Sequence, residues 1–202
     1  MAKESVITEK VLAMARKHGI LRVKDLREQG INPEYLRRLC NRGELTRIAR
    51  GLYISADADI SANIGLAQAA KWIPHGVVCL VSALQFHNVG TQSPHEIWMA
   101  IDRDIRRPRI DYPPLRIMRF SGQAFTEGVE QHKIEGVPVK VYSIAKTVAD
   151  CFKYRNKIGL DVAIEALRDC RQNKKCTNDE LWQYANICRV ARIIKPYMEA
   201  IT

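Results

Sequence analysis

The sequence predicts an α+β protein in which short helices and one hairpin come first, and a mixed domain with a small sheet and terminal helices follows. Apolar residues repeat at helical spacing before residue 43, alternate over short runs between 44 and 142, and return to helical spacing from 144 onward. Strands grouped ahead of helices are typical of α+β proteins. A polar stretch near 55–61 separates the two parts, so we expect domains over 1–56 and 60–202.

Charge is concentrated in the first of these domains. The chain has 202 residues and a formal net charge of +10, and residues 1–56 hold 12 Lys and Arg against 6 Asp and Glu. Such a concentration favours a polyanionic partner such as nucleic acid, although basicity that serves solubility alone is an alternative. No stretch is apolar over a bilayer-spanning length, and the start lacks a hydrophobic signal core. These features predict a soluble cytoplasmic protein that does not contact membranes.

Three short helices open the chain. Apolar spacing around Ile7 and Val11 predicts a helix that ends near His18-Gly19, and a second helix is expected from about Val23 to Gln29. The third is predicted to begin at Pro33, with Asn32 as its N-cap, because Asn is a good N-cap and Pro suits the first helical position. Gly43 lies beyond its end.

The third helix has one apolar side and one polar side. At 100° per residue, Leu36, Leu39 and Cys40 fall together. Opposite and beside that stripe lie Glu34, Tyr35, Arg37, Arg38, Asn41 and Arg42. Arg can bond guanine, Asn adenine and Glu the amino group of cytosine, so this face is suited to reading base edges. A solvated charged face is the alternative interpretation.

A basic hairpin follows the third helix. Glu44–Ile48 and Leu52–Ile54 are short alternating runs around a turn at Arg50-Gly51. Three helices and then a hairpin bearing Arg47 and Arg50 form the order of a winged helix-turn-helix, in which the third helix enters the major groove and the hairpin follows the backbone or minor groove. The residues expected to bind DNA are therefore Glu34, Tyr35, Arg37, Arg38, Asn41, Arg42, Arg47 and Arg50.

The run GILRVKDLREQGINPEYLRRLCNRGELTRIARGLYI resembles the N-terminal domain of AbiEi-type antitoxins, the transcriptional regulators of type IV toxin-antitoxin systems. The most specific features are L-x-x-x-G-x-L over Leu39–Leu45 and R-G-x-Y over Arg50–Tyr53. The similarity continues through VVCLVSALQFHNV and IEGVPVKVYSIAKTVADCFKYRNKIGLDVAIEALRD. It implies a repressor of its own operon that binds inverted repeats in double-stranded operator DNA. It also implies an antitoxin that opposes a nucleotidyltransferase-like toxin, without requiring a stable complex.

The second domain is expected to combine a small sheet with terminal helices. A helix is predicted over 62–72, and strands over Val77–Val81, Glu96–Ile101, Leu115–Phe120, Val129–Ile134 and Val137–Tyr142. Further helices are predicted over 144–156, 160–172, 178–187 and 190–201. Thr177 and Glu180 form a capping-box pattern. The six cysteines show no metal-ligand spacing, so reduced cysteines in the core are expected.

Two groups in the second domain are candidates for a nucleic-acid or antitoxic surface. The first is a basic loop with Arg103, Arg106, Arg107 and Arg109, near Arg116 and Arg119, for which a solvated loop is the alternative. The second is Lys146, Thr147 and Asp150, which share a helical face. The resemblance makes that stretch the one to test for antitoxicity, and a hydrogen-bonded helix start explains it equally well.

An enzyme is the alternative function. Glu96, Asp102 and Asp104 suggest metal ligands of a nuclease or transferase directed to nucleic acid, but a solvated turn is the favoured interpretation. Phosphate-binding loops and the G-x-S-x-G elbow are absent. We therefore expect no catalytic residue, metal site or cofactor. A protein-interaction module, with the C-terminal helices as the partner surface, is a third possibility.

Overall fold

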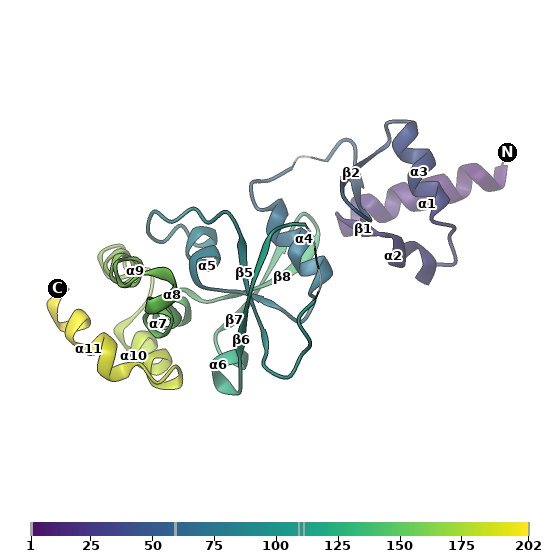
Figure 1. The fold of residues 1–202 in the computed structure, drawn as a ribbon. Coiled ribbons are helices and arrows are strands. Elements are labelled where there is room, and N and C mark those ends of the chain that lie inside the picture. The colour runs from purple at the N-terminus through teal and green to yellow at the C-terminus, as the bar shows by residue number, and fades with distance from the viewer. Residues whose placement is uncertain (1, 59, 109, 111, 202) are drawn as a thin grey trace. The chain divides into compact units, whose positions relative to one another are not determined.

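A computed structural model describes residues 2–58, 60–108, 110 and 112–201 (Figure 1). The chain forms two compact units, one made of Met1–Trp72 with Lys133–Pro138 and one of Ile73–His132 with Val139–Thr202. Both contain helices and strands, which confirms the predicted α+β class. The predicted domain limits of 56 and 60 follow the polar linker, whereas the contacts also group the helix Ile64–Trp72 with the first unit.

The first unit has the element order of a winged helix-turn-helix. Its elements are α1 (Ala2–His18), β1 (Leu21–Arg22), α2 (Val23–Glu28), α3 (Glu34–Asn41), β2 (Leu45–Ala49), β3 (Leu52–Ser55) and α4 (Ile64–Trp72). The three predicted helices and both hairpin strands are present. Strand β1, which was not predicted, pairs antiparallel with β3 and completes a three-stranded sheet of order β1-β3-β2.

Apolar residues of the three N-terminal helices, β1 and β2 form the core of this unit. The core residues are Val11, Ala15, Leu21, Leu26, Ile31, Leu36, Leu39 and Leu45. Residues of α3 thus pack against α1 and the start of the hairpin, and their burial supplies most of the free energy that holds so short a helix. The polar side of α3 is fixed on the outside as a consequence.

The second unit is built on a five-stranded sheet of order β6-β5-β4-β8-β7. The strands of this sheet are β4 (Val77–Val78), β5 (Ile97–Asp102), β6 (Leu115–Phe120), β7 (Val129–Ile134) and β8 (Val137–Tyr142), and residues 133–138 of the last two group with the first unit. Strand β5 is parallel to β6 and antiparallel to β4, and β4 is parallel to β8. Two short helices, α5 (Leu80–Phe86) and α6 (Gln123–Thr126), lie between strands in the sequence.

The remaining helices follow the sheet in the chain and cluster together (Figure 1). They are α7 (Ile144–Lys153), α8 (Arg155–Ile158), α9 (Leu160–Gln172), α10 (Asn178–Ile187) and α11 (Ala191–Ala200). The capping box at the start of α10 is confirmed, because the Glu180 N–H donates to Thr177 Oγ1 at 3.2 Å and the Thr177 N–H donates to Glu180 Oε2 at 2.7 Å.

Two sequence-based expectations differ from the structure in this unit. The strand predicted over Val77–Val81 ends at Val78, because Leu80 has a φ of 50° and begins α5. The helix predicted over 144–156 is interrupted at Tyr154, which separates α7 from α8. Helix α6 was not predicted, since its four residues are too short for a periodic signal.

The expectation of six reduced cysteines is wrong for one pair. Cys170 and Cys176 form a disulfide with a Cα–Cα distance of 6.0 Å. Lys174, at a φ of 50°, lies between the end of α9 and Cys176, and its left-handed conformation reverses the chain toward Cys170. Cys79, Cys151 and Cys188 are buried thiols. Over the ranges that the structure describes, no helix has the length and apolarity that crossing a membrane requires.

Candidate nucleic-acid interface

Local capping chemistry sets where α3 begins. The side-chain oxygen of Asn32 accepts the Glu34 N–H at 2.9 Å, and Pro33 has a φ of −56° that suits a first helical turn. The backbone N–H of Tyr35 then donates to the Asn32 carbonyl at 3.1 Å. The helix thus begins at Glu34 with Pro33 at the N-cap position, one residue later than predicted, and Asn32 accepts from its first backbone N–H.

The two sides of α3 have opposite character. Leu36 and Leu39 are each 1% exposed and belong to the core. Arg37, Arg38, Asn41 and Arg42 are exposed, and Glu34 and Tyr35 are half-buried. The structure therefore exposes Arg37, Arg38 and Asn41 on α3 and Arg42 at its C-cap, whereas Tyr35 packs partly against the core.

Glu34, at the start of this exposed face, forms an ion pair with Arg37. Arg37 donates from Nε to both carboxylate oxygens, at 2.9 and 3.1 Å, and its Nη2 lies 2.5 Å from Oε1. Arg38 Nε lies 4.0 Å from the same oxygen. The hydrogen bonds from Arg37 lower the pKa of Glu34. Glu34 is thus ionised and already paired, so Arg37 competes with a cytosine amino group for its oxygens.

Tyr35 supports Arg38 from the flank of the helix. The guanidinium carbon of Arg38 lies 5.7 Å from the centre of the Tyr35 ring, within the range of a cation–π contact. This contact reduces the freedom of a long side chain. Arg38 is therefore partly ordered before any ligand binds.

The hairpin of β2 and β3 presents the other two predicted arginines. Thr46 pairs with Ile54 and Arg47 with Tyr53, and the register then shifts between Arg47 and Ala49. The Nε of Arg47 donates to the Ala49 carbonyl at 3.2 Å across this irregularity. Arg50 is exposed at the turn. Gly51 follows at a φ of 76°, which glycine adopts without steric cost.

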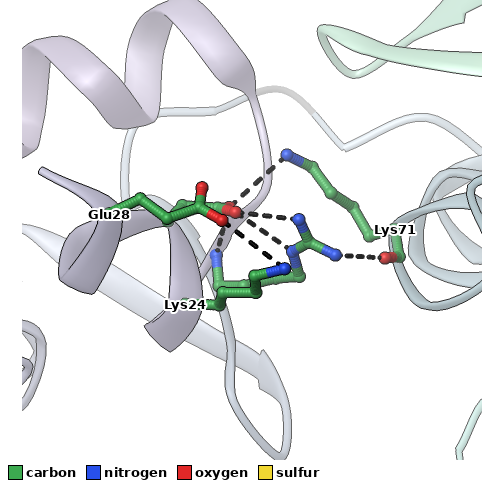
Figure 2. A network of polar contacts seen from close by, with 5 residues as sticks. Lys24, Glu28 and Lys71 are labelled. Atoms are coloured by element: carbon green, nitrogen blue, oxygen red, sulfur yellow. Dashed lines mark hydrogen bonds and ion pairs between the residues drawn. The ribbon is translucent and has the colours of Figure 1, made fainter.

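A polar network that the sequence analysis missed joins α2 to α4 (Figure 2). The Asp25 carboxylate accepts hydrogen bonds from the backbone N–H of Arg22 at 2.8 Å and from its Nε and Nη2 at 3.1 and 2.9 Å. Arg22 Nη1 also donates to the Lys71 carbonyl at 2.7 Å, and Lys71 Nζ lies 3.6 Å from Asp25. Lys24 and Glu28 pair at 3.5 Å beside it. The network holds α2, the helix that precedes α3, against α4.

Burial alone would raise the pKa of Asp25, but the hydrogen bonds from Arg22 and the charge of Lys71 outweigh it, so the pKa lies below its ordinary value of 3.8. Burial in turn lowers the pKa of Lys71. The Arg22-x-x-Asp25 spacing is visible in the sequence, whereas the approach of Lys71 from 46 residues further on is not.

We expect Asp25→Asn to lower the free energy of unfolding of the first unit by about 1–3 kcal/mol, because it weakens several hydrogen bonds to a charged acceptor in a largely buried place. Urea denaturation at pH 7 measures the loss. Because the pKa of Asp25 is lowered on folding, its contribution is present above pH 3.8 and is lost as the pH falls through the folded-state pKa. If the difference in the free energy of unfolding between the wild-type chain and Asp25→Asn stayed constant as the pH fell well below 3.8, the assigned role of Asp25 would be contradicted.

The basic loop of the second unit is partly used for internal contacts. Arg103, Arg106 and Arg107 are exposed, and Arg109 lies outside the described residues. Arg119 Nη1 donates to the carbonyl oxygens of Arg103 and Ile105, the latter at 3.0 Å.

Arg116 Nη1 lies 3.3 Å from Glu96 Oε1, and its guanidinium carbon lies 4.6 Å from the Trp98 ring centre. Arg116 and Arg119 therefore have structural contacts, and the loop arginines remain candidates for contact with nucleic acid.

Lys146, Thr147 and Asp150 do not form a surface, which corrects the sequence-based expectation. All three are fully buried in α7, which packs against α5, α9, α10 and α11. Lys146 Nζ pairs with Asp150 Oδ2, the Cys188 thiol donates to Asp150 Oδ1 at 3.2 Å, and Thr147 Oγ1 donates to the Tyr142 carbonyl at 3.2 Å. Their shared helical face is polar, but it is satisfied inside the core.

The acidic residues of the enzyme hypothesis are not brought together. Glu96 precedes β5 and Asp102 ends it, so the strand separates them. Asp102 Oδ1 accepts the Asp104 N–H at 3.0 Å, as in a solvated turn. Within the described ranges, no group of three His, Cys, Asp or Glu residues has a geometry that would hold a metal ion.

Comparisons with known proteins bear on the first unit. Residues 9–56 match the family described as "Transcriptional regulator, AbiEi antitoxin". The whole chain is similar in fold to the crystal structure of the RV2827C protein from Mycobacterium tuberculosis, with a TM-score of 0.58 and 15% sequence identity. That similarity covers 96% of this chain and 79% of the other. The sequence has no match among curated proteins.

The matched residues run from within α1 to the end of β3, and they include α3 and both strands of the hairpin. At 15% identity, the likeness to the solved structure concerns the fold alone. The candidate interface therefore lies in the part of this chain that is similar to the AbiEi antitoxin transcriptional regulators.

Proposed function

We propose that this protein is a DNA-binding transcriptional autorepressor and the antitoxin of a type IV toxin-antitoxin operon, acting in the cytoplasm against a nucleotidyltransferase-like toxin. The observation that carries the DNA-binding part is the exposed basic face of α3 next to the arginine-bearing hairpin. The family match over residues 9–56 supports both the regulatory and the antitoxin parts.

Position on the helix assigns different roles to the polar residues. Arg38 and Asn41 lie opposite the buried Leu36 and Leu39, so they enter the major groove most deeply and read base edges. The flanking arginines of α3 and the hairpin hold phosphates and set the register. These flanking residues are Arg37, Arg42, Arg47 and Arg50. Tyr35 orients Arg38, and Glu34 orients Arg37 until DNA displaces it.

The direct test is binding of the full chain to the DNA upstream of its own gene, compared with a scrambled duplex of equal length, over a salt titration. We expect specific binding whose affinity falls steeply with salt. An operator with inverted repeats would bind two copies of the chain, one on each half-site. Equal, weak binding to both duplexes would refute the repressor and leave the basic face as a charged surface.

Single substitutions separate base reading from phosphate binding. Arg47→Gln is expected to weaken binding to the operator and to the scrambled duplex alike, and to reduce the slope of log K against log salt by about one. Arg38→Ala is expected to reduce the difference in binding free energy between the operator and the scrambled duplex by about 1–3 kcal/mol. Anisotropy titrations measure both. Undiminished discrimination by Arg38→Ala would show that the assigned reading face is wrong.

The antitoxin part needs a separate test, because repression and neutralisation need not share residues. Cells that express a nucleotidyltransferase-like toxin encoded next to this gene are expected to regain growth when the full chain is supplied from an unrelated promoter. The Arg38→Ala chain supplied in the same way tests whether neutralisation requires specific DNA binding. Absence of rescue by the wild-type chain, at equal protein level, would contradict the antitoxin assignment.

A further inference from the structure

The second unit contains a polar cleft of about 690 Å³ that the proposed function does not use. Three segments line it: the turn before α6, the end of α7 with the start of α8, and the corner between α10 and α11. Its volume lies within the range of small-molecule sites, which is about 300–1,000 Å³.

The cleft has a strongly positive lining. Lys153, Arg155 and Arg189 contribute one positive charge each, and no carboxylate lines it among the residues that the structure describes. Three cations gathered in a concave site create a potential that attracts anions, since the surrounding protein focuses the field. The cleft is therefore suited to a ligand with several negative charges.

Two of these cations are partly ordered in the absence of a ligand. Arg155 Nη1 donates to the Phe152 carbonyl at 2.9 Å, which leaves the other guanidinium nitrogens for further hydrogen bonds. Lys153 Nζ lies 5.9 Å from the Phe120 ring centre and 5.8 Å from the Tyr154 ring centre. Ordering of these side chains before binding reduces the entropy that a ligand has to offset.

Arg189 occupies a backbone position at which glycine is favoured. It has a φ of 59° at the end of α10, where the Val190 N–H donates to the Ala185 carbonyl at 2.8 Å and closes the helix. Such left-handed helix ends are usually glycine, because a Cβ is disfavoured there. Arg189 thus has an unfavourable backbone conformation, and its side chain places a positive charge at the cleft.

The thiol in the lining of the cleft adds no negative charge. Cys188 lines it, and burial raises the pKa of its thiol to about 12, so the sulfur stays protonated. The thiol donates to Asp150, whose charge is paired by Lys146. The field in the cleft is therefore set by its three basic side chains.

We propose that this cleft binds the triphosphate group of a nucleotide. Arg155 and Arg189 suit phosphate oxygens because each guanidinium can donate two parallel hydrogen bonds, and Lys153 supplies a point charge. The amide side chains of Gln123 and Asn186 offer donors and acceptors for a base or ribose, and Ile193 offers an apolar contact. The site lies wholly in the second unit and does not depend on DNA binding by the first.

Calorimetric titration of the full chain with ATP, GTP, CTP, UTP and inorganic triphosphate tests the proposal. At least one nucleotide is expected to bind more tightly than inorganic triphosphate. Arg189→Gly is expected to weaken that binding about tenfold or more, because it removes a charged hydrogen-bond donor from the cleft. It is not expected to lower the thermal midpoint of unfolding, because glycine adopts the left-handed backbone conformation of residue 189 without strain.

Lys174→Gly is the matched control, because Lys174 also ends a helix at a left-handed φ, of 50°, is exposed, and does not line the cleft. Its affinity for the nucleotide is expected to equal that of the wild-type chain. Absence of nucleotide binding at millimolar concentration, or equal weakening by both variants, would overturn the site. Binding of nucleotides no tighter than that of inorganic triphosphate would overturn the nucleotide as the ligand.

Discussion

Replacing Arg37, Arg38 and Arg42 together with glutamine is expected to weaken binding to the operator about a thousandfold, if each arginine contributes at least about 1.4 kcal/mol. Arg37 and Arg38 are exposed on α3 and Arg42 is exposed at its C-cap, and glutamine keeps the helical propensity while it removes the charge. The buried Leu36 and Leu39 are untouched, so the fold should persist. Anisotropy titration at fixed salt gives the affinity, and circular dichroism checks the fold.

A matched triple variant separates the site from the net charge. Lys10, Arg16 and Lys17 are exposed on α1, and their replacement with glutamine removes the same three charges from the same unit. This control is expected to bind the operator within a few fold of the wild-type chain, because long-range charge is screened beyond about 10 Å at moderate salt. Equal losses in the two triple variants would show that α3 has no special role in binding.

The second large effect is expected inside the second unit, where Asp150→Ala should lower the free energy of unfolding by about 3–5 kcal/mol. Lys146 and Asp150 are both fully buried, so removal of the carboxylate leaves an ammonium group without its ionic partner in the core. The rings of Phe120 and Tyr142, at 5.0 and 4.1 Å from Nζ, compensate only part of the charge. Urea denaturation with a probe in the second unit measures the loss.

Two comparisons make this prediction specific to burial. Lys195 and Glu199 have the same i,i+4 spacing on α11, at 3.8 Å, but are 60% and 65% exposed, so Glu199→Ala should cost under about 0.5 kcal/mol. The double variant Lys146→Met with Asp150→Leu should recover most of the stability, because it removes both buried charges. A small cost for Asp150→Ala, similar to that of Glu199→Ala, would contradict the assigned core.

The first unit was largely predictable because its signals are local. Asn32 and Pro33 start α3, Gly51 allows the hairpin turn, and the period of Leu36 and Leu39 identifies the buried side, all within a few residues of the effect. Strand β1 was missed because two residues carry no periodic signal. Its existence depends on pairing Leu21 with Tyr53, 32 positions further along the chain.

The second unit shows what spacing alone does not reveal. Lys146 and Asp150 have the i,i+4 spacing of an exposed helical pair, and only the packing of four other helices around α7 turns them into a buried one. Cys170 and Cys176 were wrongly expected to be reduced, because their pairing depends on the reversal at Lys174 after α9. In both cases tertiary packing, which a single sequence does not display, decided the outcome.

The ion pair between Glu34 and Arg37 has a consequence for how the protein responds to ionic strength. Glu34 is a tethered counterion, which stays in the complex when Arg37 turns toward a phosphate. The salt dependence of binding follows the phosphate charge that the protein neutralises, and Glu34 offsets one of the four arginines proposed to hold phosphates, Arg37, Arg42, Arg47 and Arg50. The slope of log K against log salt should therefore reflect about three charges, so the complex is expected to tolerate salt better than a count of these arginines implies.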